Sequence, residues 1–331
     1  ENPCARVPKG NHEDVNVAVA AARQAFSGWA NTATEKRAEI MQAAADEMQR
    51  RVDELIDAHV ISMGCPRQLA AELHVDAPIA AMRYYADRTL QTDDVEEKGS
   101  VVLYKEPVGV CALITPWNYP LHQLIGKLAP ALAAGCTIVA KPATQTPLQD
   151  FIMAQIFETV GLPAGVFNLV SGSGSVVGPV MSSHPDVDMV SFTGSTDAGI
   201  QVAEAAAPTV KRVCQELGGK SPYIITEDAD LQAAVRYGVN DVMLNTGQTC
   251  NALTRMLVPR SRYTEAVEIA KTVAEETVLG DPNDINVTMG PMASASQKQK
   301  VLHYIETGMA EGARMVTGGT AMPPGLDVGY Y

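Results

Sequence analysis

The sequence predicts an α/β fold organised around an open, mostly parallel sheet. Segments with a helical pattern lie near residues 120–134, 146–160, 175–183 and 197–206. Short β-branched runs alternate with them at residues 108–114, 136–142, 166–172, 188–194 and 221–227. Strands that alternate with helices at this spacing indicate parallel βαβ units. The chain has 331 residues, 46% of them hydrophobic, which is enough for two domains and a large apolar core.

The segments on either side of these runs predict packing helices and a second α/β unit. In the first ninety residues, apolar side chains recur at helical spacing over 15–29 and over 40–56, opposite a charged face. Neither stretch carries obvious chemistry. Beyond residue 227 we expect a helix that leads to Cys250, a strand over 254–261, and helices over 263–278 and near 294–311.

The composition excludes several classes of protein. A formal net charge of −13 repels nucleic acid and anionic membrane surfaces. The six cysteines form no CxxC pair and no metal-type cluster with the six histidines, so we expect a reducing compartment without a metal site or a disulfide framework. The sequence has no signal-peptide pattern and no run long enough to span a membrane. We therefore predict a cytoplasmic protein.

Glycine-rich loops follow two of the predicted strands, at the edge where open α/β sheets bind their ligands. The segment SGSGSVVG (171–178) opens a helix, and its glycines, Gly174 and Gly178 among them, would let backbone N–H groups approach a diphosphate. Its spacing is GxGxxxG, because Val177 replaces the usual third glycine, and a flexible turn explains it equally well. A second strand-to-helix loop, which ends in Ser195, raises the odds of a nucleotide ligand.

Three polar residues near these strand ends suit an enzyme site, although each also has an ordinary structural interpretation. Lys141 ends a run, where it either binds a ribose or phosphate or is simply solvated. Asn118 either donates an amide hydrogen to an oxyanion or caps the helix that begins near residue 120. Glu216 precedes two glycines, which suits a mobile general base, but it also fits the end of a helix.

Cys250 is the cysteine with the local character of a reactive site. It follows a glycine and lies among small polar residues in GQTCN, whereas Cys111 and Cys136 lie in apolar runs and are expected in the core. We expect Cys214 near the end of a helix. A thiol reacts at neutral pH only with a lowered pKa or a nearby base, so the function of Cys250 depends on partners elsewhere in the chain.

Taken together, these motifs resemble those of the NAD(P)-dependent aldehyde dehydrogenase superfamily. TPWNYP, LAPALAAGCTIVAKPATQTPL, SFTGST, QELGGKSP and GQTC occur in the order of that family, and the likeness runs from about residue 5 to residue 331. The intervals from Asn118 to Lys141 and from Glu216 to Cys250 also match the family's spacing. Five motifs that share both order and spacing make a chance assembly negligible.

The resemblance implies a covalent mechanism and a nicotinamide cofactor, NAD or NADP. Cys250 would attack the aldehyde, the Asn118 amide and the Cys250 N–H would hold the oxyanion, and Glu216 would activate the hydrolytic water. Lys127 matches a family lysine that assists proton transfer. Lys141 would bind the adenosine ribose of the cofactor, and Ser195 would contact its diphosphate. Gly174 and Gly178 would open the helix below the adenine and the diphosphate. Near the nicotinamide would lie Pro116, Trp117, Leu217 and Gly218.

Three departures from the family's pattern bear on this expectation. Thr144 stands where many NAD-preferring relatives have a glutamate that binds both ribose hydroxyls, so we expect NADP to be tolerated alongside NAD. Gly126 stands where several relatives place a bulky aromatic residue, and with Gln123 and Asn251 nearby it predicts a wider, more polar substrate tunnel. The family's C-terminal portion would follow Tyr331, so we expect the second domain to be incomplete.

The resemblance also divides the chain. Residues 1–88 and 108–218 would form a Rossmann-like cofactor domain, 219–331 a catalytic α/β domain, and 89–107 part of a small bridging β element through which subunits associate as a homodimer or homotetramer. The substrate would be a small-molecule aldehyde. Two alternatives remain open. A coenzyme A-dependent acylating enzyme is disfavoured by Glu216, and a non-catalytic structural member of the family is disfavoured by the intact set of Cys250, Glu216 and Asn118.

Overall fold

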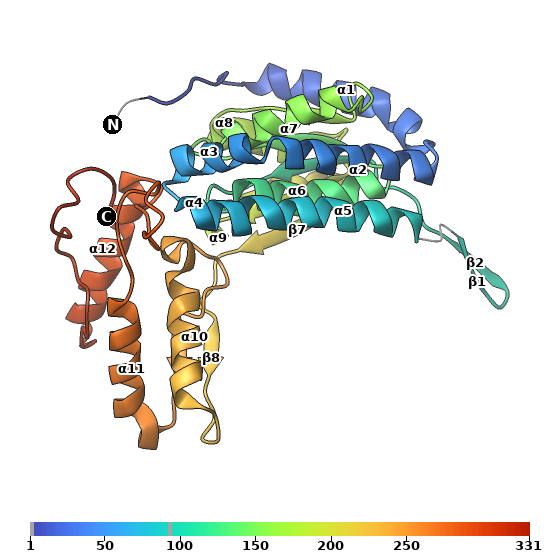
Figure 1. Ribbon diagram of the computed structural model, residues 1–331. Helices are drawn as coiled ribbons and strands as arrows, with labels where there is room; N and C mark the ends of the chain where they lie inside the picture. Colours follow the sequence, from blue (N-terminus) through green and yellow to red (C-terminus); the bar gives the residue numbers. More distant parts are fainter. Residues whose placement is uncertain (1–2, 92–94) are drawn as a thin grey trace. The chain divides into compact units, whose positions relative to one another are not determined.

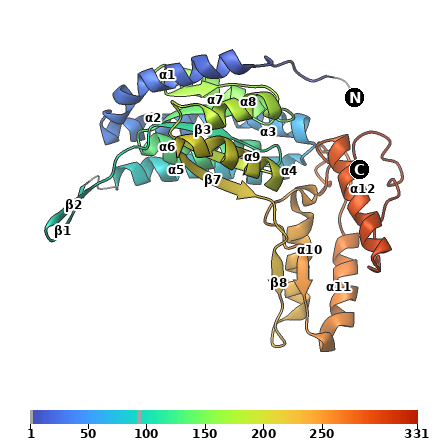
Figure 2. The same cartoon turned by 180° about the vertical axis from the view of Figure 1, so that it is seen from behind.

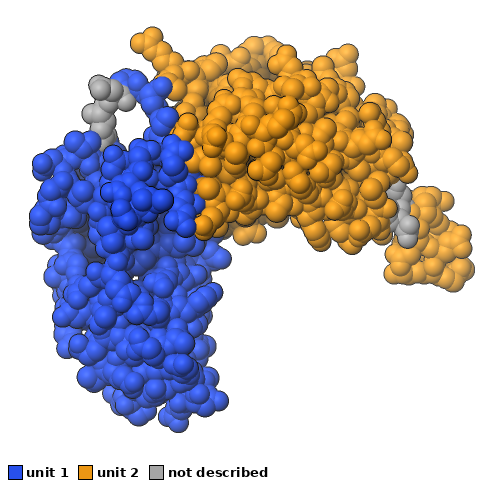
Figure 3. Space-filling view, in the orientation of Figure 1, with its two compact units in different colours: residues 1–4, 60–70, 218–331 blue, residues 5–59, 71–217 orange. Residues whose placement is uncertain are grey.

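The computed structural model describes residues 3–91 and 95–331 (Figure 1). The chain divides into two compact units (Figure 3). The larger unit contains residues 5–59 and 71–217. The smaller unit contains residues 60–70 and 218–331, together with Pro3 and Cys4.

The larger unit is built on a parallel five-stranded sheet, as the alternating pattern predicts. Its strand order is β5-β4-β3-β6-β7, and every neighbouring pair is parallel. The strands β3 and β4 are buried along their whole length, which is why β3 and the middle of β4 consist of apolar residues. The strands are β3 (Val110–Ile114), β4 (Thr137–Lys141), β5 (Phe167–Leu169), β6 (Met189–Gly194) and β7 (Arg212–Leu217).

The fifth strand of this sheet is not the one that the sequence predicts. The run at 221–227 contains β8 (Pro222–Ile224), which pairs with β9 (Arg255–Leu257) in a separate two-stranded sheet of the smaller unit. The fifth strand is β7, so Cys214 and Glu216 lie in a strand and not at the end of a helix. Because β7 is a mostly exposed edge strand with the sequence RVCQEL, it lacks the apolar run that marks the buried strands.

Helices cover both faces of the sheet (Figures 1 and 2). On one face α1, α8 and α9 pack on the strands, and their apolar side chains form a core with β3 and β6. On the other face α6 and α7 contact the sheet, and α2 and α5 pack outside them. The helices are α1 (His12–Ala30), α2 (Thr34–Arg50), α5 (Ala77–Leu90), α6 (Pro120–Ala133), α7 (Leu148–Thr159), α8 (Gly174–Ser183) and α9 (Thr196–Ala206), followed by the short η2 (Ala207–Thr209).

The expected packing helices of the N-terminal region are confirmed, but the second is split. The apolar stripe predicted over residues 40–56 belongs to α2 and to α3 (Val52–Met63), which follows after a single residue. The short α4 (Arg67–Leu69) and the π-helical η1 (Ala70–Asp76) then lead into α5. In the described chain, residues 3–91 and 95–331, no helix combines the length and the apolar character needed to cross a bilayer.

A two-stranded antiparallel hairpin follows α5. It is formed by β1 (Val95–Lys98) and β2 (Val101–Tyr104), and Figure 1 shows it extending away from the helices of the larger unit. All eight of its strand residues are exposed, five of them large and hydrophobic. The hairpin falls in the range 89–107, of which residues 92–94 lie outside the described residues. Self-association through this range stays a prediction.

The smaller unit contains the second α/β arrangement that the sequence predicts. Side chains from α10, from α11 and from the segment after β8 form its core, which includes Ile225, Val235 and Val273. The predicted strand over 254–261 is shorter, and only β9 is paired. Besides β8 and β9, the elements are α10 (Leu231–Met243), η3 (Leu244–Gly247), η4 (Arg260–Arg262), α11 (Tyr263–Glu275) and α12 (Ala295–Ala310).

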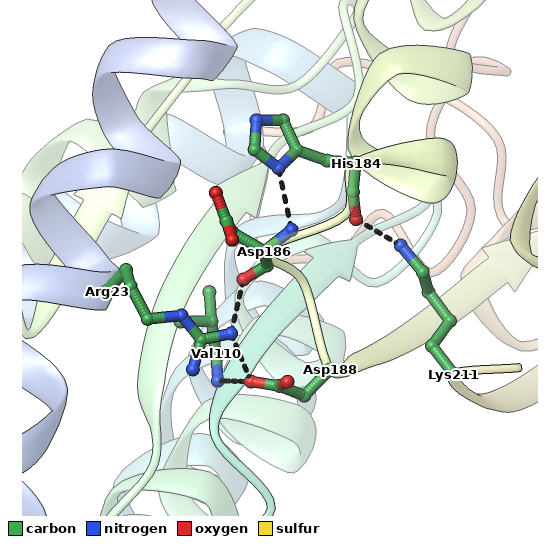
Figure 4. Close-up of polar contacts among 6 residues, drawn as sticks. All are labelled: Arg23, Val110, His184, Asp186, Asp188 and Lys211. Atoms are coloured by element: carbon green, nitrogen blue, oxygen red, sulfur yellow. Dashed lines mark hydrogen bonds and ion pairs between the residues drawn. The ribbon is translucent and has the colours of Figure 1, made fainter. Parts of the chain in front are cut away.

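Hydrogen bonds tie together the amino ends of the strands in the larger unit (Figure 4). The Arg23 guanidinium donates to the Asp188 carboxylate and to the backbone oxygen of Asp186, both at 2.6 Å. The backbone N–H of Val110 donates to the same carboxylate oxygen at 2.7 Å. The Lys211 ammonium donates to the backbone oxygen of His184 at 2.6 Å. These bonds fix the edge of the sheet that is opposite to the ligand-binding edge.

Replacement of Gly109 by alanine is expected to destabilise the larger unit by about 2–4 kcal/mol. Gly109 has a φ of +125°, and a Cβ atom there would lie 1.8 Å from the Asp188 carboxylate oxygen that binds Arg23 and Val110. The variant therefore combines backbone strain with the loss of these bonds. Thermal unfolding followed by circular dichroism measures the change. Gly28→Ala, in open space on α1, is the control and should unfold no earlier than the parent; an unshifted melting temperature for Gly109→Ala would contradict the argument.

Candidate active site

The loop after β3 carries Pro116, Trp117 and Asn118, all of them half-buried. Two hydrogen bonds hold this loop against the neighbouring strand connection. The Thr115 N–H donates to the backbone oxygen of Lys141 at 3.1 Å, and the Thr146 hydroxyl donates to that of Trp117 at 3.2 Å. The N-cap of α6 is Tyr119, so Asn118 is not the helix cap that the sequence allowed as an alternative.

Lys141 is buried and not a solvated strand end. It is the last residue of β4, is 3% exposed, and donates from its ammonium to the backbone oxygen of Pro142 at 2.7 Å. Burial lowers the pKa of Lys141 below its usual value, and the charge of Asp150 opposes that shift. Thr144, three residues further on, donates from its hydroxyl to the backbone oxygen of Gly172 at 3.2 Å and so joins this loop to the glycine-rich loop.

Two helix N-termini follow strands β5 and β6 at the carboxyl edge of the sheet. Ser173 is the N-cap of α8. A Cβ atom at Gly174 or at Gly178 would meet nothing within 4 Å, but only Gly174 is exposed, whereas Gly178 is buried. Ser195 is the N-cap of α9 and accepts a hydrogen bond from the Ala198 N–H at 3.3 Å. Exposed helix N-termini attract negative charge, and the arrangement therefore fits a dinucleotide diphosphate.

Polar side chains from α6, β6 and β7 form one group, which we call the Lys127 cluster: Gln123, Lys127, Ser191, Thr193, Cys214 and Glu216. The Lys127 ammonium donates to the Ser191 hydroxyl at 3.1 Å, and the Thr193 hydroxyl donates to the Gln123 side chain at 3.2 Å. Ser191 and Thr193 pair in register with Cys214 and Glu216. Burial lowers the pKa of the Lys127 ammonium, and the Cys214 and Glu216 groups partly oppose this.

Ser191 and Thr193 were missed by the sequence reasoning. Their spacing in SFT places both on one face of β6, and the cluster accounts for two hydroxyls within a strand that is otherwise apolar. The Glu216 carboxylate is exposed at the end of the edge strand β7. Leu217, the next residue, packs against α9, because a Cβ atom at Gly199 would lie 2.7 Å from its side chain.

Cys250 lies in the smaller unit, after η3, with an exposure between that of core and surface residues. Asn245, Thr246 and Gly247 precede it with φ angles of 53°, 58° and 71°, a run of left-handed backbone that is strained for the two residues other than glycine. Such strain persists only where surrounding contacts enforce it. The loop that carries the thiol is thus held in one conformation.

Hydrogen bonds within the smaller unit enforce this conformation. The Thr246 hydroxyl donates to the backbone oxygen of Gly290 at 3.2 Å. The Gln248 amide donates to the backbone oxygen of Asn245 at 3.1 Å and accepts from the Ala293 N–H at 3.0 Å. A Cβ atom at Gly219 would lie 3.1 Å from the Cys250 backbone oxygen, so the glycine pair of QELGG passes close to the cysteine. Gly218 itself is exposed.

The other cysteines do not share this environment. Cys111 and Cys136 are buried, as predicted from their apolar runs. Cys65 is buried as well, and burial raises the pKa of its thiol to about 12. Cys4 and Cys214 are exposed. The predicted site residues divide between the units: Gly218 and Cys250 belong to the smaller unit and all the others to the larger.

An open parallel sheet with helix N-termini at its carboxyl edge is the architecture of nucleotide-binding α/β enzymes. The chain belongs to the aldehyde dehydrogenase family, because the model of that family matches residues 1–331. Aldehyde oxidation is the reaction of this family.

Three proteins illustrate the similarity. The chain is 48% identical over 323 residues to the 3-succinoylsemialdehyde-pyridine dehydrogenase of a Pseudomonas species. The aligned residues cover 97% of this chain and 68% of that protein. It is similar to a mutant of aldehyde dehydrogenase C from Pseudomonas syringae, solved with NAD+ and octanal, with a TM-score of 0.98 and 45% identity over 100% of this chain and 68% of that one. An NADP-dependent enzyme of E. coli matches with a TM-score of 0.93 and 34% identity, and the match covers 98% of this chain and 68% of that one.

Proposed function

We propose that the protein oxidises an aldehyde to a carboxylic acid with NAD or NADP, through a covalent adduct on Cys250. The observation that carries the proposal is the partly exposed residue Cys250, which follows a strained left-handed segment that local hydrogen bonds hold in place. In this proposal the larger unit binds the cofactor and the smaller unit supplies the nucleophile. The family membership supports it, as do the five family motifs that the chain contains.

In the first half of the proposed reaction, the Cys250 thiolate adds to the carbonyl carbon of the aldehyde. The carbonyl oxygen becomes an oxyanion, which the Asn118 amide and the Cys250 backbone N–H stabilise by donating hydrogen bonds. Each such donor contributes about 3–4 kcal/mol to the transition state in comparable enzymes. A bound nicotinamide would supply the acceptor for the hydride that leaves this adduct, and Cys250 would then carry the acyl group as a thioester.

In the second half, Glu216 takes a proton from a water molecule, which attacks the thioester and releases the carboxylic acid and the free thiol. The exposed end of an edge strand, directly before two glycines, leaves this carboxylate room to move. Lys127 lies in the same cluster as Glu216, and burial lowers the pKa of its ammonium, which favours the release of a proton from that group.

For the cofactor, we infer that the helix N-termini at Ser173 and Ser195 bind the diphosphate, and that Gly174 and Gly178 admit the dinucleotide to the surface of α8. Lys141 would bind the adenosine ribose from the end of β4. Pro116 and Trp117 would line the nicotinamide end, with Leu217 and Gly218 nearby. Thr144 brings no charge to the ribose, so its position does not discriminate against a 2′-phosphate.

The substrate that we infer has a bulky or extended tail. Gly126 lies on α6, is exposed, and has open space where a side chain would begin. The P. syringae relative was solved with octanal, and the Pseudomonas dehydrogenase is named for a pyridine semialdehyde. Both aldehydes are longer than a short aliphatic one, in keeping with a tunnel that is wide at Gly126.

The experiment that tests the proposed function is a screen of aldehydes with each cofactor. Acetaldehyde, octanal and a pyridine-bearing semialdehyde would be supplied with NAD or NADP, and the reduced nicotinamide and the carboxylic acid would be measured together. We expect one acid formed per reduced nicotinamide, and higher kcat/KM for the two larger aldehydes. Acid formation that requires added coenzyme A would instead support the acylating alternative, and no turnover with any aldehyde would refute the proposal.

A further inference from the structure

Four ring side chains form a group inside the larger unit that the proposed reaction does not use, and we call this group the His74 stack: His59, His74, Tyr119 and His122. The His74 imidazole stacks on the Tyr119 ring, with 4.9 Å between the ring centroids and 25° between the planes. The His59 imidazole contacts His74 at 5.1 Å and 37°. The His122 ring meets Tyr119 edge-on, at 6.2 Å and 69°. All three separations are those of aromatic pairs that attract one another.

The stack is a fixed part of the core. The side chains of His59 and His74 are completely buried, and Tyr119 is 8% exposed. The Nδ1–H of His59 donates to the backbone oxygen of Leu55, one turn earlier in α3, at 2.7 Å. Burial lowers the pKa of His59 to about 4, so this ring is uncharged at neutral pH and packs as an aromatic group. His74 therefore contacts a ring whose own position is fixed by a hydrogen bond.

His74 lies in a segment with an unusual backbone. The segment η1 is π-helical and separates α4 from α5. Turns of π-helix are rare and occur frequently at functional sites. The wider turn changes the spacing of side chains along the segment, so His74 departs from the place that a continuous α-helix would give it. The helix α5, into which η1 leads, packs against α6, whose N-cap is Tyr119.

The stack adjoins the proposed oxyanion donor, because Tyr119 directly follows Asn118. On the other side of Asn118, the backbone oxygen of Trp117 accepts a hydrogen bond from the Thr146 hydroxyl at 3.2 Å. The chain is thus anchored both before and after Asn118, by this hydrogen bond and by the ring of His74. A donor aimed at a transition state must lie within about 0.5 Å of its productive position. A displacement of about 1 Å can lower the rate by about 10²-fold.

We propose that His74 is a positioning residue for the oxyanion site, because its ring fixes Tyr119 and thereby places the Asn118 amide. The inference rests on the proposed function, which makes Asn118 an oxyanion donor. His74 is completely buried, so it acts through Tyr119 and not on the substrate. What it contributes is the flat face of a ring. A second planar ring at this position should therefore serve in its place, whereas an aliphatic side chain should not.

The first test replaces His74 by leucine and by phenylalanine in the purified full chain. Leucine fills much of the space without a flat face, and phenylalanine keeps the face. The rate constant of the rapid first phase of NAD(P)H formation is measured by stopped flow, with the aldehyde of highest kcat/KM. We expect His74→Leu to lower it by about 10- to 100-fold and His74→Phe by less than about threefold. The dissociation constant of the cofactor, measured by fluorescence, should stay within about twofold in both variants.

The second test asks whether His74 acts through Asn118. Asn118→Ala removes the amide and should lower the same rate constant by about 10²–10³-fold in the parent. In His74→Leu the amide is already displaced. Its removal in that background should therefore cost at least about tenfold less than in the parent. Two residues that act independently would instead show the full loss in both backgrounds.

His303→Leu is the matched control. His303 also contacts a tyrosine ring, Tyr304, at 5.8 Å, but both are exposed on α12 in the smaller unit. Its replacement should leave the rate constant within about twofold. Tyr119→Leu breaks the same stack from the other partner. It should reproduce both the loss of rate and the smaller effect of removing Asn118.

The outcomes separate this inference from the proposed function. Equal rates for His74→Leu and His74→Phe, or the full Asn118 effect in the His74→Leu background, would overturn the inference and leave Asn118 as an oxyanion donor. A lower melting temperature with weaker cofactor binding, or failure of both leucine variants to fold, would show a role in structure alone and would also overturn it. If Asn118→Ala had no effect in the parent, the oxyanion assignment itself would be wrong, and the inference would fall with it.

Discussion

Replacement of Cys250 by alanine is expected to lower the aldehyde-dependent formation of NAD(P)H by at least about 10⁴-fold. Without the thiol no hemithioacetal forms, and hydride transfer would have to start from a free or hydrated aldehyde. The remaining rate would come from binding and from the oxyanion donors alone. The measurement is the initial rate of nicotinamide reduction at saturating aldehyde and cofactor, with dissociation of the cofactor measured separately by fluorescence.

Cys4→Ala provides the control for this experiment. Cys4 is a free and exposed cysteine outside the predicted site, so its removal should leave the rate unchanged. Treatment of the parent with one equivalent of a thiol-alkylating reagent should inactivate it, with the label found on Cys250. Substantial turnover by Cys250→Ala would mean that the nucleophile lies elsewhere or that the reaction needs none.

The sequence predicts the centre of the sheet better than its edge. Strands β3 and β4 are buried on both faces, so their residues form apolar runs that stand out from the surrounding helices. The edge strand β7 has one neighbour and exposed side chains, and its composition therefore resembles that of a loop or a helix end. The sequence therefore predicts the apolar run at 221–227 as the fifth strand of this sheet. In the structure, residues of that run pack in the core of the smaller unit.

In the candidate site, the sequence predicts which residue types take part but not their geometry. Cys250 is recognisable from its small polar neighbours, but the left-handed backbone at Asn245 and Thr246 is not, because threonine disfavours that conformation and long-range contacts impose it. In the sequence, Lys141 also fits a solvated strand end. Its burial depends on long-range packing, which no local pattern of residues records.

Replacement of Glu216 by glutamine is expected to separate the two halves of the reaction. Hydride transfer precedes the step in which Glu216 acts, so the variant should still form about one NAD(P)H per active site in a rapid first phase. Steady-state turnover should then fall by about 10²–10³-fold, because glutamine cannot take the proton of the attacking water. Stopped-flow measurement of nicotinamide reduction resolves both phases, and mass spectrometry of the quenched protein should find the acyl group on Cys250.

This result would also decide whether the Glu216 carboxylate activates the Cys250 thiol or the hydrolytic water. If the carboxylate activated the Cys250 thiol, the glutamine variant would lose the rapid first phase along with steady-state turnover, and no acyl group would accumulate. If it acted only on water, a small thiol added as an alternative nucleophile would restore turnover by accepting the acyl group. Glu204→Gln, which removes an exposed carboxylate on α9, should show neither effect. A rapid phase followed by rescue with thiol is therefore the outcome required of a general base for hydrolysis, and full steady-state turnover without any added thiol would remove Glu216 from the mechanism.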